Sequence, residues 1–123
     1  MVLKDILNEI VYEDETHEFK LMLNDADSFS WLKTVAGFAN HIGGDFYIGV
    51  NDKDQKLVGF TLNEADKIRN KFNNEVNLHL FPRPIYKIDF INYNIKDDVR
   101  YIILIHIFES EQKPIIFKFK EAL

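Results

Sequence analysis

The first part of the chain alternates between polar and apolar positions in a way that predicts two helices. The first is expected within residues 1–11, where apolar side chains recur at helical spacing and charged ones fill the other side. The second follows a polar loop, with Ser28 or Ser30 as its N-terminal cap. It ends at Gly43-Gly44, because glycine readily takes the left-handed conformation common at helix C-termini.

A longer helix is predicted in the middle of the chain. Thr61 and Glu64 have the spacing of a capping box, in which two side chains bond each other's backbone amides. The apolar positions that follow have helical spacing, and the helix must stop before Pro82. Those apolar positions are Leu62, Ala65, Ile68, Phe72 and Val76.

Period-two alternation and apolar runs predict strands elsewhere. Segment 99–108 is apolar on both sides and should be the central strand of the sheet. Before it, the alternation in 85–95 changes phase at Phe90-Ile91, as it would at a bulge, and Lys96-Asp97-Asp98 supplies the turn. The other expected strands are 17–23, 45–52 with its hairpin partner 56–60, and 113–119 as a last, more exposed strand.

This order of elements predicts an α+β fold with a mixed, mainly antiparallel sheet, a β-hairpin and helices packed mainly on one face. The length of 123 residues is that of one domain, 1–123. Because the chain stops directly after strand-like sequence, we expect the domain to be a piece of a longer protein.

The amino-acid composition excludes several kinds of functional site. The chain has no cysteine, which excludes disulfides, thiolate zinc sites, iron–sulfur clusters and cysteine nucleophiles. Its longest apolar run, 101–105, is too short to cross a bilayer, and acidic residues occur too early for a signal peptide. We therefore expect a soluble protein with no membrane partner, in the cytoplasm by default.

The charge balance limits nucleic-acid binding to a local patch. Fifteen Lys and Arg face 20 Asp and Glu, so the net charge is −5 and the surface as a whole repels polyanions. Basic residues gather in two places, where they either contact phosphates or simply keep the surface soluble. One group is Lys67, Arg69 and Lys71 on the long helix; the other is Arg83, Lys87, Lys113, Lys118 and Lys120 on the C-terminal strands.

The pair Gly43-Gly44 can be compared with the glycines of phosphate-binding loops. In those loops the glycines precede a helix, whereas Gly43 and Gly44 follow one and face its negative C-terminal end. A turn is therefore the favoured interpretation, and a ligand contact through exposed Asn40 or the glycine amides is the alternative.

Carboxylates cluster at the start of the first strand. Glu13 and Glu18 could hold a divalent cation or share a proton, although acidic loops are usually just solvated. The histidines have no metal-ligand spacing, and the serines lack the glycines of a nucleophile elbow.

Three blocks of sequence stand out for their order and spacing. Glu13 with Glu18-Phe19-Lys20 fits the pattern E-x(4)-E-F-K, and 36–40 with Gly43-Gly44 fits A-F-A-N-x-x-G-G. The stretch from 47–52 to Val58-Gly59 fits an I-G-V-x-D hairpin that ends in V-G. Together the three blocks resemble a known family, the Schlafen AlbA-type domain. A weaker similarity continues to about Ile116, so nearly the whole chain is covered.

The resemblance implies an α+β nucleic-acid-binding module, usually N-terminal in a longer regulator-like protein and described as DNA-binding or transcription-associated. Family members with ribonuclease activity place a metal site on carboxylates that here correspond to Glu13 and Glu18, and add an acid beside the glycine pair. Ile42 occupies that position in this chain, and Asp45 beyond the glycines is the candidate substitute.

These observations lead to one main hypothesis and two alternatives. The main one is a DNA-binding, transcriptional-regulator-like domain without catalysis or cofactor of its own. Its expected contacts with DNA or RNA are Lys20, Asn40, Gly43, Gly44, Lys113, Lys118 and Lys120. The first alternative is a nuclease using Mg²⁺ or Mn²⁺ on Glu13 and Glu18, with Asp45 as a further catalytic candidate. The second is a protein-interaction or dimerisation module, for instance a homodimer formed through the last strand.

Overall fold

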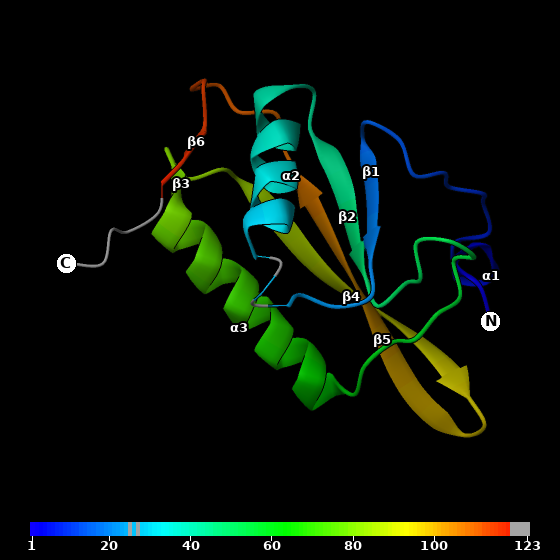
Figure 1. Ribbon diagram of the computed structural model, residues 1–123. Helices are drawn as coiled ribbons and strands as arrows, with labels where there is room; N and C mark the ends of the chain where they lie inside the picture. Colours follow the sequence, from blue (N-terminus) through cyan, green and yellow to red (C-terminus); the bar gives the residue numbers. More distant parts are fainter. Residues whose placement is uncertain (25, 27, 119–123) are drawn as a thin grey trace.

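The protein is built around one four-stranded sheet, which Figure 1 shows beside its helices. The computed structural model describes residues 1–24, 26 and 28–118. Along the sheet the strands lie in the order β1 (His17–Lys20), β2 (Gly44–Ile48), β5 (Asp98–Ile107) and β4 (Tyr86–Ile95). β1 is parallel to β2 and the other neighbours are antiparallel, which confirms the predicted mixed α+β sheet and its apolar inner strand.

Two helices cover one face of the sheet. α2 (Ser28–Asn40) and α3 (Leu62–His79) pack there over a core that includes stacked Trp31 and Phe72. We call this the helical face. The opposite face is covered over part of its area by the N-terminal segment with the short α1 (Leu3–Leu7), through a second cluster around Phe19 and Ile102. Helices therefore lie mainly on one face, as predicted.

The N-terminus of α3 is capped as predicted, whereas the N-terminus of α2 differs from the prediction. At α3 the capping box is present: the Glu64 amide donates to Thr61 Oγ1 (3.2 Å), and Thr61 N–H donates to Glu64 Oε1 (2.9 Å). α2, however, already includes Ser28 and Ser30, and the Ser28 hydroxyl donates to the Asn24 carbonyl (3.4 Å), so neither serine stands in the cap position.

The glycine pair makes the predicted turn. Gly43 has φ +88° and donates its N–H to the Phe38 carbonyl (2.8 Å), closing the end of α2. A Cβ at Gly43 would lie 2.7 Å from the Ile107 carbonyl oxygen, and one at Gly44 would lie 2.6 Å from the Phe38 ring. Only glycine fits these positions without displacement of a neighbour.

The predicted hairpin after β2 forms its turn but not its second strand. Residues 56–60 return against 49–51, where Val50 bridges Leu57 and the Val58 N–H donates to the Gly49 carbonyl (2.9 Å), but they form no strand. The physical reason is that β2 already has β1 on one side and β5 on the other. No edge of β2 remains for a third partner.

The predicted bulge in β4 is also wrong. Its register with β5 is unbroken from Tyr86 opposite Ile107 to Ile95 opposite Asp98. The phase changes because Phe90 packs into the core under the helices, whereas Ile91 packs into the cluster on the opposite face.

Two short strands lie outside the main sheet. β6 (Ile116–Phe117) pairs antiparallel with β3 (Leu80–Phe81), which the sequence pattern did not predict. The last strand is therefore shorter than expected and pairs within the chain. No helix in the described part of the chain is long and apolar enough to cross a membrane.

Candidate functional site

The two glutamates of the first sequence block meet at the outer edge of β1. Glu13 Oε2 accepts a hydrogen bond from the Phe19 backbone N–H (3.2 Å), and its side chain also bonds that of Glu18. Burial of the half-buried Glu18 carboxyl raises its pKa, and the negative charge of Glu13 raises it further. Lys20 acts in the opposite direction and lowers this pKa.

Asp52 is a third carboxylate in this neighbourhood that sequence reasoning missed. Its charge also contributes to the raised pKa of Glu18. It lies in the turn beyond β2, and nothing in the sequence pattern indicated that this turn comes back toward β1. The acidic group at the β1 edge is therefore Glu13, Glu18 and Asp52.

Asp45 lies on the other face of the sheet. It is directly opposite His17 of β1 and His106 of β5, and successive strand residues point to opposite faces, so Asp45 points away from the side of Glu18. Its Oδ1 is 2.6 Å from His106 Nδ1, and its Oδ2 is 3.8 Å from His17 Nε2. The structure thus brings Glu13 and Glu18 together and places Asp45 in a separate histidine network.

The donor set at the β1 edge does not fit the metal centre that the family resemblance implies. One oxygen of Glu13 already accepts the Phe19 backbone N–H, which leaves that oxygen less able to bind a cation. A hard cation is held by oxygen ligands that converge on one point. Over residues 1–24, 26 and 28–118, no group of three acidic or histidine side chains is arranged to hold a metal.

The residues around the glycine pair are engaged in holding the fold together. Asn40 bonds both backbone groups of Ile115: its Nδ2 donates to the carbonyl (3.0 Å) and its Oδ1 accepts from the N–H (2.7 Å). Gly43 and Gly44 are buried, and Gly44 is paired with Ile107 in the sheet. These groups tie α2 to the C-terminal segment, a role that sequence reasoning did not assign to them.

The predicted contact lysines do not form one surface. Lys113 Nζ binds Glu109 (2.7 Å) and the His41 carbonyl (3.3 Å), near the start of β2. Lys118 lies over the Phe81 ring (5.8 Å to its centre), and Lys20 pairs with Ile48 at the far end of β2. Lys120 lies outside the described residues.

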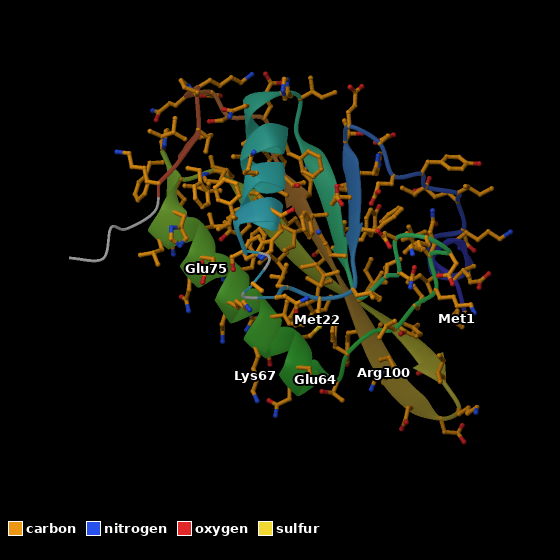
Figure 2. All side chains as sticks on the ribbon, in the orientation of Figure 1. Met1, Met22, Glu64, Lys67, Glu75 and Arg100 are labelled. Atoms are coloured by element: carbon orange, nitrogen blue, oxygen red, sulfur yellow. The ribbon has the colours of Figure 1, made fainter. Side chains whose placement is uncertain are left out.

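The cations of α3 differ in how they are held. Arg69 forms an ion pair with Asp66 (3.0 Å) and lies over the Phe90 ring. Lys71 Nζ donates to the Leu23 carbonyl (2.9 Å), which brings α3 against the segment that follows Lys20. Lys67 is exposed and projects from the side of α3 that faces away from the sheet (Figure 2).

The outer side of α3 has an unusual composition. One row of exposed residues at helical spacing consists of amides with a single cation, and the exposed carboxylate of Glu64 lies beside this row. We call this row the α3 stripe. A search for polar as well as apolar helical periodicity would have found it. The stripe consists of Asn63, Lys67, Asn70, Asn74 and Asn77.

Comparison with known proteins identifies the family. The family model described as Schlafen, AlbA_2 matches residues 13–122, and the chain therefore belongs to the Schlafen AlbA_2 family. The match covers all three sequence blocks that carry the resemblance.

A solved structure has the same fold. The chain is similar to the solution NMR structure of the N-terminal domain of a putative ATP-dependent DNA helicase RecG-related protein from Nitrosomonas europaea. The TM-score is 0.64 at 20% identity, over 96% of this chain and 79% of that chain. No curated protein matches the sequence.

Proposed function

We propose that this protein is a nucleic-acid-binding domain, with DNA in a regulator-type parent protein as its first candidate ligand, and that the α3 stripe is the contact surface. Membership of the Schlafen AlbA_2 family supports the binding of nucleic acid, and the solved neighbour belongs to a protein whose name includes a DNA helicase. The stripe supports the location.

The chemistry of the stripe suits this ligand. An asparagine amide both donates and accepts hydrogen bonds, so it can contact phosphates, sugars and base edges. Lys67 supplies a positive charge within the row, whereas Arg69 is paired with Asp66 and Lys71 with the Leu23 carbonyl. The row itself has no carboxylate, while Glu64, Asp66 and Glu75 lie beside it on the same helix, so binding to a polyanion would depend on the row's own amides and Lys67.

The observation that carries the proposal is that the asparagines of the stripe lower the stability of helix α3. Asn63, Asn70, Asn74 and Asn77 are exposed, so core packing does not require them. Asparagine is a weak helix former, and together they cost about 2 kcal/mol of helix stability relative to alanine. Residues that oppose their own secondary structure without a packing gain are typical of functional surfaces.

A fluorescence anisotropy titration with labelled single- and double-stranded DNA and RNA at several salt concentrations tests the proposal. We expect micromolar or weaker binding whose affinity falls with salt, since each neutralised phosphate adds roughly 0.7 to 0.9 to the log–log slope. Lys67→Glu should weaken binding about 10-fold and reduce that slope by about 1 or more, because it removes a phosphate contact and adds repulsion. Asn70→Asp, which changes charge but not shape, should act in the same direction.

Matched variants away from the stripe control for net charge. Lys53→Glu and Asn94→Asp make the same substitutions at exposed positions off α3 and should change the affinity less than about 2-fold. A salt-independent affinity, or equal losses for Lys67→Glu and Lys53→Glu, would contradict the proposal. RNA cleavage in Mg²⁺ or Mn²⁺ that disappears in Glu18→Gln would instead favour the nuclease alternative.

A further inference from the structure

The outer edge of β4 is long and open. β4 runs over 10 residues, from Tyr86 to Ile95, and is the last strand of the main sheet on its side. Within the described residues, no other strand or bridge pairs with this edge. Open edges of this length are templates for pairing with another strand, and proteins usually block them.

The backbone direction shows which residues of β4 present hydrogen-bonding groups outward. The Ile85 carbonyl accepts from Phe108 N–H (3.0 Å) and so points toward β5. In an antiparallel ladder these directions alternate along the strand. The N–H and C=O groups of Tyr86, Ile88 and Phe90 therefore point to the open edge.

The side chains of segment 85–91 are arranged symmetrically about Ile88. The sequence reads Ile-Tyr-Lys-Ile-Asp-Phe-Ile, so equal distances on either side of Ile88 bring two isoleucines, two aromatic rings, and a lysine with an aspartate. Two such strands placed antiparallel with Ile88 opposite Ile88 would match like with like and opposite charge with opposite charge.

We propose that two copies of this chain pair antiparallel through the open β4 edges, centred on Ile88, to form one continuous sheet. The outward backbone groups of Tyr86, Ile88 and Phe90 then bond those of Phe90, Ile88 and Tyr86 of the second copy. Pro84 has no N–H and would face Asn92, which ends the pairing on both sides.

The side chains on both faces of β4 are compatible with this register. Tyr86 and Phe90 both lie on the helical face, where each packs at the border of the core. Lys87 and Asp89 lie on the opposite face with side chains 69% and 50% exposed, and each would meet its opposite charge in the second copy. Ile85, at 73% exposed, would be covered by Ile91 of the second copy.

The interface is small. It consists of one strand pair, which places it below the standard size of stable protein complexes. We therefore expect a dissociation constant in the range of about 10 μM to 1 mM. Sedimentation velocity over about 5 μM to 1 mM protein should show a shift from monomer to dimer, and the outward amides of Tyr86, Ile88 and Phe90 should exchange more slowly with solvent as the dimer forms.

Charge exchange tests the register. Lys87→Asp should face Asp89 with a like charge twice per dimer and raise the dissociation constant at least 10-fold, and Asp89→Lys should do the same. The double variant Lys87→Asp/Asp89→Lys should restore dimerisation to within about 3-fold of the natural sequence. Lys53→Asp, the same reversal at an exposed turn, should leave it unchanged.

Cross-linking gives a second, independent readout. The chain contains no cysteine, so a variant with Lys87→Cys and Asp89→Cys can form disulfides only between the introduced residues. We expect an oxidised dimer for this variant and little for either single variant, because position 87 faces 89 and not itself. The proposal would be overturned if the protein with its natural sequence stayed monomeric at about 1 mM. This holds even if the open edge then paired with a different protein. So would a double charge exchange that fails to restore the dimer.

Discussion

One edge of the sheet is blocked and the other is open. At β1 the edge is only 4 residues long, and the Glu13 carboxylate accepts the outward Phe19 N–H. At β4 the edge is 10 residues long and carries the self-complementary segment 85–91. The difference indicates that an acidic side chain beside a strand can have a structural role, because it blocks the edge against pairing. The open edge, in contrast, has a sequence that suits pairing with another strand.

The largest expected effect concerns the side chains that anchor the two edge strands. Phe19 of β1 is 1% exposed, whereas Phe90 of β4 is only partly buried. Phe19→Ala should lower the free energy of unfolding by about 3–5 kcal/mol. Phe90→Ala should lower it by about 1–2 kcal/mol. Urea denaturation at a few micromolar protein, where the dimer is absent, measures both, and a larger loss for Phe90→Ala would reverse the comparison.

An intermediate effect is expected at the turn that leads into β2, the strand that holds β1 in place. Gly43→Ala puts a Cβ at φ +88° and 2.7 Å from the Ile107 carbonyl oxygen, which should cost about 1–3 kcal/mol. Gly37→Ala is the matched control, since nothing lies within 4 Å of its added Cβ inside α2. It should raise stability by about 0.5–1 kcal/mol through helix propensity. Thermal melting should therefore show shifts of opposite sign, and the same sign for both would contradict the role of Gly43 in the turn.

The smallest expected effect is a change in melting temperature on substitution of Glu18 at the β1 edge. The pKa of Glu18 is raised, so its ionised form destabilises the folded state at pH values above the folded pKa. Glu18→Gln should raise the melting temperature by about 1–3 °C at pH 7. This gain should vanish below about pH 4.5, the ordinary Glu value, where the carboxyl is protonated in both states.

Glu15→Gln serves as the control for that measurement, because Glu15 is exposed in the same acidic segment. It should shift the melting temperature by less than about 1 °C. A lower melting temperature for Glu18→Gln at every pH would mean that the charged carboxylate stabilises the fold, which is the opposite of the effect expected from its raised pKa.

Features with a local cause were predictable from the sequence. The capping box at Thr61 and Glu64 is formed, and Lys96 and Asp97 take the positive φ values of the expected turn. Strand partners could not be predicted in the same way, because alternation gives the faces of a strand but not its neighbour. The parallel pairing of β1 with β2 is what leaves residues 56–60 without a partner strand.

The candidate site was predictable only in part, for the same reason. Glu13 and Glu18 are close in sequence and meet in space. Asp45 is close to the glycines, yet its face depends on the register of β2 against β1, which places it opposite His17. Asn40 looked like an exposed ligand contact because its partner, Ile115, lies far away along the chain.

The bond between Asp45 and His106 joins positions 61 apart in sequence and lies on the seam between β2 and β5. On one side of that seam, β1, α2 and β2 form a single crossover unit within 17–48; on the other, β4 and β5 form a hairpin within 86–107. The strands of each half are joined by 21–43 in the first and 96–97 in the second, whereas the longer segment 49–85 joins the two halves. We therefore expect the two halves to gain structure early and their joining across this seam to limit the rate of folding.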